Sequence, residues 1–500
     1  MTETAPFPSR CYGVLMHPTS FPGPEPIGTL GAEAHEFVDW LATTGASIWQ
    51  ILPLTYLGSE DSPYFSPSSF AGNTWLIDLR ELVAAGLIAG IGTPPRGDET
   101  QVDFEAMRTW KAPLLDAAAG AFLDDDGHPW WPDYERFVAE SPWLADVCHF
   151  IARKHADPVS PWWDWDPAIR RREPAALAAS AIEHAAAIER EQVLQFFFDR
   201  QWQAVRARAN AAGIVVLGDT PIYVAPDSAD VWAHQSQFQL DDDGRLTAQA
   251  GVPPDYFSET GQLWGNPIYR WDVMADDGFS WWIDRLGRTL DQTGIVRIDH
   301  FRALSAYWSV PADDETAIDG TWMTGPGQAF VDAVGQAFPS LPIVAEDLGD
   351  LDDDVLALRD RNDLVGMRVL QFGFDGPPND HHPSRIVERS VVYTGTHDND
   401  TLAGWWTSSP RRRKERVRRD TGMPPRVRTR KAVWSLIETV LASPAVAAVV
   451  PVQDLLVLGS ESRMNLPGTA TGNWQWRLRP GALTERLASD LRSLAESTNR

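Results

Sequence analysis

Residues 295–300 read Ile-Val-Arg-Ile-Asp-His, a short apolar run that ends in charged side chains. Aliphatic residues that continue without alternation are typical of a strand that helices cover on both faces. Such strands occur almost only in parallel sheets, and here the strand would end at an acid, Asp299. The stretch therefore predicts one strand of an α/β protein.

Short apolar runs bounded by turn residues recur along the whole chain, and eight can be counted. They cover residues 11–16, 47–52, 214–217, 295–298, 342–345, 367–372, 391–393 and 455–458. Segments that favour helix lie between them, for example 35–43, 281–289, 329–338 and 431–441. Eight strands that alternate with helices predict a closed parallel (β/α)8 barrel, the TIM barrel fold.

The chain is about twice as long as such a barrel requires. A barrel needs about 250 residues, whereas this sequence has 500. We expect one catalytic barrel domain, residues 1–500, with large insertions that form subdomains around a cleft. The insertion 53–213 should be mainly helical, and 219–294 should carry a Gly-, Pro- and aromatic-rich lid loop at 250–266.

Charge excludes several classes of partner. Lys and Arg number 43 and Asp and Glu 69, which gives a net charge of −26. A nucleic acid or an anionic membrane surface would repel such a protein, so we expect neither as a partner. The Arg-rich run 411–419 is the local exception, and we interpret it as a solvated helix face rather than an anion site.

Cysteine usage and hydropathy indicate a cytoplasmic protein. The two cysteines, Cys11 and Cys148, are too few for a disulfide framework. The first ten residues lack the basic and apolar segments of a secretory signal. The uncharged stretch 439–453 is interrupted by Pro444 and Pro451 and is shorter than the about 18 residues that indicate a membrane span.

Acidic residues follow several of the expected strands. In chain order they are Asp219, Asp299, Glu346 and Asp398. All strands of a parallel barrel end on the same rim, so we expect these acids to converge in space. An acid after a strand can also serve only as a helix N-cap, but capping does not require acids at so many strand ends.

Convergent carboxylates suit either metal binding or glycoside hydrolysis. Arg297 lies two residues before Asp299 on one strand, so both side chains face the same way. A fixed cation there favours the ionised form of Asp299, as a nucleophile needs, and makes a metal cage less favourable. Glu346 follows an apolar strand among other acids, and both burial and negative charge should raise its pKa, which suits a proton donor.

The retaining reaction that these residues favour needs two carboxyl groups about 5 to 5.5 Å apart. Asp398 would then bind sugar hydroxyls and help to distort the ring. Part of the Trp content, 23 residues against 9 Tyr, would present flat apolar faces to sugar rings. The sequence has no glycine-rich phosphate loop and no Cys/His ligand set, so we predict no cofactor and no metal.

Nine segments in order resemble the amylomaltases, or 4-alpha-glucanotransferases, of glycoside hydrolase family 77. They are GVLMHPTSFPGPEPIGTLG, WQILPL, DSPYFSPSSFAGN, GDTPIYVAPDSADVWAH, PPDYFSETGQLWGNPIY, RIDHFRALSAYW, VAEDLG, YTGTHDNDT and RMNLPGT. The resemblance covers essentially the full chain. Phe65 and Pro67 stand where many relatives have Gln and Phe, and Glu60 replaces a frequent Gly, which concerns chain-length or acceptor preference rather than reaction class.

The resemblance implies Asp299 as nucleophile, Glu346 as acid/base and Asp398 as transition-state stabiliser. It also implies contacts to the donor glucan from a wider set, to which we add the neighbours Asn266 and His300. That set is Tyr64, Asp219, Trp264, Arg297, His397 and Asn465. Trp264 would belong to a mobile loop, 250–266, that covers the cleft.

The implied activity is transfer of an α-1,4-glucan segment to the 4-hydroxyl of another glucan or of glucose. It would serve maltodextrin, glycogen or starch metabolism. The lid residues Pro253, Pro254, Tyr256 and Trp264 would exclude water, so that a sugar hydroxyl outcompetes it. Two alternatives stay open: an α-amylase-like hydrolase that uses the same acids, and a non-catalytic glucan-binding module.

Overall fold

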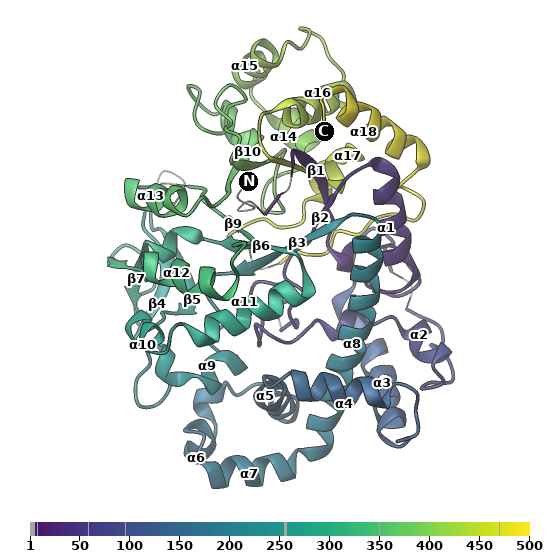
Figure 1. Ribbon diagram of the computed structural model, residues 1–500, viewed down its shortest axis with the longest axis vertical. Coiled ribbons are helices and arrows are strands. Elements are labelled where there is room, and N and C mark those ends of the chain that lie inside the picture. Colours follow the sequence, from purple (N-terminus) through teal and green to yellow (C-terminus); the bar gives the residue numbers. More distant parts are fainter. Residues whose placement is uncertain are drawn as a thin grey trace.

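Eight parallel strands form a barrel at the centre of the computed structural model (Figure 1). The structure describes residues 6–7, 9–58, 60–95, 97–254, 258–349, 351–469 and 471–500. Their order around the barrel is β10-β11-β12-β1-β2-β3-β6-β9. A bridge between Val344 and Val365 joins the two outer strands and closes the ring. The strands are β1 (Cys11–Leu15), β2 (Ile48–Gln50), β3 (Val215–Pro221), β6 (Ile295–Asp299), β9 (Ile343–Ala345), β10 (Gly366–Val369), β11 (Ser390–Tyr393) and β12 (Ala447–Pro451).

Seven of the eight strands lie where the apolar runs predict them, and the eighth prediction is wrong. The last strand is β12, whereas the expected run 455–458 begins at the last residue of the short helix α17 (Val452–Leu455). The sequence of β12, Ala-Ala-Val-Val-Pro, is rich in alanine, which has a low strand propensity. Every residue of β12 is nevertheless buried between β1 and β11, so tertiary packing decides its conformation.

Helices cover the outside of the barrel, and all four segments expected as helices are helical. The covering helices include α1 (Ala32–Thr44), α8 (Ala185–Ala211), α11 (Ser280–Gln292), α12 (Gly327–Ala337), α16 (Thr429–Ala442) and α18 (Glu485–Ser497). In α1 the residues Phe37, Val38 and Leu41 are buried at helical spacing. The helix ends where Gly45 adopts φ 84°, a left-handed conformation that glycine accepts without strain.

The segment between β2 and β3 forms a group of helices at one end of the molecule, far from α15 (Arg411–Thr421) at the other (Figure 1). Besides α8 they are α2 (Leu79–Ala84), α3 (Phe104–Leu123), α4 (Trp131–Glu140), α5 (Leu144–Ala156), α6 (Pro167–Arg170) and α7 (Pro174–Glu183). A fully buried ion pair between Lys111 of α3 and Glu25 fixes this group to the loop after β1.

A second, antiparallel sheet lies beside the barrel, and two of its strands include both ends of the segment 250–266 that we expected to be a lid loop. Its order is β5-β4-β7-β8, from β4 (Ala248–Val252), β5 (Gln262–Pro267), β7 (Ala306–Pro311) and β8 (Thr321–Thr324). Gly251 is needed because a Cβ there would lie 2.4 Å from the Gln262 carbonyl oxygen. The glycines thus allow close strand pairing rather than marking a loop. Residues 255–257, which include Tyr256, lie outside the described residues.

Two further expectations concern the Arg-rich run 411–419 and membrane-spanning helices. The Arg-rich run forms α15, whose only buried residue is Val417, as expected of a solvated helix. Among the described residues, no helix combines the length and apolar character that crossing a membrane requires.

Candidate active site

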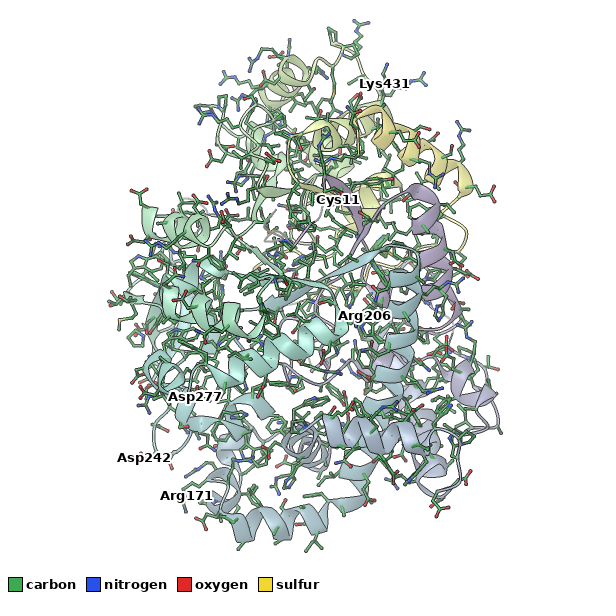
Figure 2. The ribbon with its side chains drawn as sticks, viewed as in Figure 1. Cys11, Arg171, Arg206, Asp242, Asp277 and Lys431 are labelled. Atoms are coloured by element: carbon green, nitrogen blue, oxygen red, sulfur yellow. The ribbon has the colours of Figure 1, made fainter. Side chains whose placement is uncertain are left out.

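A cleft of about 780 Å³ opens at the C-terminal ends of the barrel strands. Its walls come from the segment 60–65, the ends of β3, β6 and β11, strand β5, and residues 465–475. Figure 2 shows the side chains on the ribbon, packed between the helices and strands throughout the molecule. Among the lining residues are Tyr64, Trp264, Asn266, Asp299, His300, His397, Asp398 and Asn465.

Arg297 joins two acids at the mouth of the barrel. Its Nη1 lies 2.8 and 2.7 Å from the two carboxylate oxygens of Asp219, and its Nη2 lies 2.5 Å from Oδ1 of Asp299. Arg297 and Asp219 are buried, whereas the Asp299 side chain is 33% exposed to the cleft. The arrangement arises because β3 and β6 pair in parallel with Asp219 opposite Arg297. A buried cation thus supports an acid that substrate can reach.

Glu346 lies directly after β9 and beside Asp299. Its Oε2 accepts a hydrogen bond of 2.8 Å from the His300 N–H, and its Oε1 accepts one of 2.9 Å from the Leu348 N–H. Burial, with the negative charge of Asp299 adding to it, raises the pKa of Glu346 to about 8. Glu346 therefore carries its proton at neutral pH, as expected from the sequence.

Asp398 follows β11 and is ionised over the ordinary pH range. Burial alone would raise its pKa, but the neighbouring His397 and a hydrogen bond from Asn465 outweigh that effect and bring the pKa to about 2. His397 Nε2 lies 3.3 Å from Oδ2, and Asn465 Nδ2 donates to Oδ1 at 2.6 Å. The side chain is therefore held from two different chain segments.

Tyr64 links these acids to an aromatic wall. Its hydroxyl donates a 2.8 Å hydrogen bond to Oδ2 of Asp219. Its ring stacks on His397, with centroids 5.1 Å apart and an interplanar angle of 17°, and Trp474 lies 5.6 Å away. These rings form one flat side of the cleft, which suits the apolar face of a sugar ring.

Trp264 and His300 also line the cleft. Their rings meet edge to face at 4.8 Å, and Tyr223 lies 6.2 Å from Trp264. Burial lowers the pKa of His300 to about 4, so the imidazole is neutral at pH 7. The Asn266 amide donates to the Val224 carbonyl at 2.7 Å, which ties β5 to the segment after β3.

The acids of the cleft are bound by Arg297, Asn465 and main-chain N–H groups rather than arranged around a common point. Across the described ranges, three His, Cys, Asp or Glu side chains nowhere gather into a set that could hold a metal ion.

Sequence comparison shows the ancestry of this chain. Residues 16–484 match the family model of glycoside hydrolase family 77, described as 4-alpha-glucanotransferase. A 4-alpha-glucanotransferase of Thermus thermophilus is 45% identical over 501 residues, which cover 98% of this chain and 99% of that protein. The chain belongs to glycoside hydrolase family 77. The chloroplastic or amyloplastic 4-alpha-glucanotransferase of Solanum tuberosum is 42% identical over 97% of this chain and 85% of its own length.

A solved structure supports the membership in family 77. The amylomaltase of Streptococcus agalactiae, determined in complex with acarbose, superimposes with a TM-score of 0.94 at 38% identity. The match covers 98% of this chain and 99% of that one. Both the barrel and the insertions around it are therefore those of the family.

The sequence patterns of this family 77 chain gave no signal for two residues, one that lines the cleft and one that supports a segment of its wall. Trp474 lines the cleft with φ 65°, a left-handed conformation that is rare outside glycine. Arg463 donates to the main chain of Asp398 and Asn465. Neither follows a barrel strand, so the pattern of acids at strand ends gives no signal for them. The Gly- and Asn-rich run around Trp474 was the only hint of a tight loop.

Proposed function

We propose that this enzyme transfers a segment of an α-1,4-glucan to the 4-hydroxyl of another glucan or of glucose, by a retaining double displacement. The observation that carries the proposal is the different surroundings of two neighbouring acids. Glu346 has a pKa of about 8, while Asp299 lies against the Arg297 guanidinium. One group can give a proton while the other attacks, as a retaining mechanism requires.

In the first step a carboxylate oxygen of Asp299 attacks the anomeric carbon of the donor. The bond from that carbon to the leaving 4-oxygen breaks, and the proton of Glu346 moves to this oxygen. In the second step Glu346 takes the proton from the 4-hydroxyl of the acceptor, whose oxygen attacks the same carbon and releases Asp299. Two inversions leave the α configuration unchanged.

The other predicted site residues would bind the donor. Asp398, fixed by His397 and Asn465, would accept hydrogen bonds from ring hydroxyls and stabilise a distorted sugar. Tyr64 and Trp264, which both line the cleft, would contact apolar sugar faces. Asn266 and His300 would support the Trp264 wall, since both contact it or its strand.

Transfer instead of hydrolysis requires that a sugar hydroxyl reach the intermediate before water does. Pro253, Pro254 and Trp264 lie in or beside the β4–β5 hairpin, which borders the cleft through Trp264, and would help to exclude water. We infer that maltodextrins, glycogen or starch are the substrates and that the cytoplasm is the site of action.

Incubation with maltotriose tests the proposal. Transfer gives glucose and longer oligosaccharides while the total of reducing ends stays constant. A rise in reducing ends would instead identify an α-amylase-like hydrolase. Binding of maltotriose without any product would identify a glucan-binding module.

A further inference from the structure

Two chain segments meet behind Asp398 and form one unit. The first is residues 396–400, which follow β11, and the second is residues 463–465. The Asn465 N–H donates to the His397 carbonyl at 3.1 Å, and the Asn465 side chain donates to Oδ1 of Asp398 at 2.6 Å. The position of the Asp398 carboxylate therefore depends on how these segments are held together.

Arg463 bonds both segments at once. Its Nη2 donates to the Asp398 carbonyl oxygen, and its Nε donates to the Asn465 carbonyl oxygen at 2.6 Å. Within the described part of the chain, no carboxylate lies within ion-pair distance of this guanidinium. Its donors go to the main chain of the catalytic acid and of the residue that orients it.

We infer that Arg463 is a positioning residue for Asp398, an inference that rests on the proposed function. The planar guanidinium offers donors in a fixed fork, so the two carbonyl groups keep one relative position. Lysine would supply a single ammonium point and could not fix both. A displacement of about 1 Å in a catalytic group can cost about 100-fold in rate.

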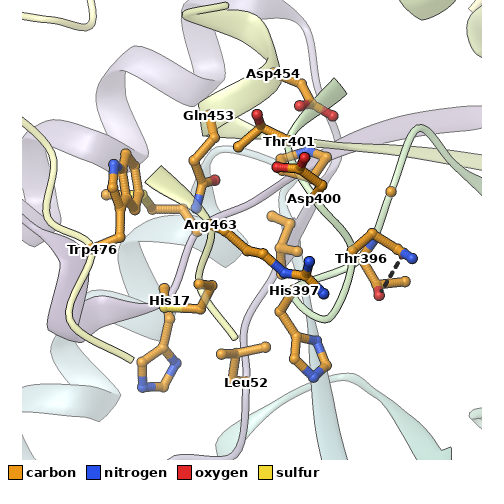
Figure 3. Close-up of a pocket in the computed structure, with 16 residues that line it drawn as sticks. His17, Leu52, Thr396, His397, Asp400, Thr401, Gln453, Asp454, Arg463 and Trp476 are labelled. Carbon is orange, nitrogen blue, oxygen red and sulfur yellow. Dashed lines mark hydrogen bonds between the residues drawn. The ribbon is translucent and has the colours of Figure 1, made fainter. Parts of the chain in front are cut away.

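The surroundings of Arg463 explain why this position can be tested chemically. The side chain lines a small cavity of about 20 Å³, and His397 borders both this cavity and the cleft. Figure 3 shows the Arg463 side chain extending toward the segment with Thr396 and His397, with His17 on the other side. His17 Nδ1 and Asp400 Oδ1 are buried here without a hydrogen-bond partner among the described residues. Removal of the Arg463 side chain would leave a space that faces the carbonyl oxygens of Asp398 and Asn465, to which a free guanidinium ion can donate instead.

The experiment compares Arg463→Lys with a matched control, Arg206→Lys. Arg206 is also half-buried and also donates to two main-chain carbonyls, of Leu290 at 3.4 Å and Thr293 at 2.7 Å. It lies on α8 near the start of β6, away from the cleft (Figure 2). With maltotriose, Arg463→Lys should lower kcat about 10- to 100-fold with KM within about threefold, whereas Arg206→Lys should keep the kcat of the wild type.

Arg463→Ala provides the second measurement. Millimolar guanidinium chloride, below denaturing concentrations, should restore its kcat at least partly, and sodium chloride at equal ionic strength should not. Equal kcat in Arg463→Lys and wild type, or equal recovery with both salts, would overturn the inference. If the wild-type enzyme forms no oligosaccharide longer than maltotriose, the proposed function itself is refuted. The two failures can therefore be told apart.

Discussion

The main-chain N–H of His300 donates a hydrogen bond of 2.8 Å to Oε2 of Glu346. His300 immediately follows Asp299, so this bond ties the proposed acid/base to the proposed nucleophile through a single peptide unit. His300 has φ 54°, a left-handed conformation directly after β6. The relative position of the two acids is thus fixed by the backbone rather than by flexible side chains.

Replacement of Glu346 by Gln should abolish proton transfer while leaving the shape of the site almost unchanged. We expect kcat with maltotriose to fall about 100- to 10,000-fold, the usual contribution of a positioned general acid. Binding of maltotriose, measured by calorimetry, should remain within a few-fold of wild type. The matched control is Glu438→Gln on the exposed side of α16, which should have no effect. Unchanged turnover in Glu346→Gln would leave another group as the acid.

The pH profile should report the raised pKa of Glu346. Burial and the charge of Asp299 raise this pKa to about 8, so the protonated form prevails below that value. Because the acid form starts the reaction, kcat/KM should be lost as the pH rises through about 8. Asp398, with a pKa of about 2, stays ionised throughout. Initial rates of glucose release between pH 5 and 10 measure the profile, and a decline centred near pH 5 would contradict this assignment.

Arg297 should prove necessary for both stability and catalysis. Arg297→Met leaves Asp219 buried without its cation, which should lower the free energy of unfolding by about 3–5 kcal/mol. Adding Asp219→Asn should recover much of that loss in guanidinium chloride unfolding. The double variant should nevertheless stay at least about 100-fold less active, since Asp299 still lacks its partner. Recovery of activity together with stability would show that Arg297 only stabilises the fold.

Local patterns in the sequence were sufficient for most of the barrel and for its acids. Seven strands coincide with predicted apolar runs. Asp219 and Asp299 lie in the last residues of their strands, and Glu346 and Asp398 lie in the segments that follow theirs, so the parallel topology brings all four to one rim. The strand β12 is also an apolar run, but its alanines have a low strand propensity, and its burial between two neighbours comes from the finished barrel.

Local sequence patterns could not predict the second sheet, Trp474 or Arg463, and the reason is different. The pairing of β4 with β5 depends on Gly251, a residue that equally suggests a loop. Arg463 acts on the main chain of a segment 65 residues away, and hydrogen bonds to carbonyl groups impose no recognisable spacing. Contacts of this kind can be found only in three dimensions.

The buried pair of Lys111 and Glu25 should matter for stability and not for catalysis. Both side chains are almost fully buried, and Glu25 also accepts a 3.1 Å hydrogen bond from the Leu79 N–H. Lys111→Met should leave the Glu25 charge buried without a partner and cost about 3–5 kcal/mol in the free energy of unfolding. Adding Glu25→Gln should return part of this loss, because the remaining group is neutral and keeps its bond to α2. The kcat of the folded variants on maltotriose should equal that of wild type.

A comparison with Glu415→Ala sets the scale, since its exposed pair with Arg411 should contribute less than about 1 kcal/mol. A loss of equal size in both cases would show that the helical insertion does not depend on the buried pair.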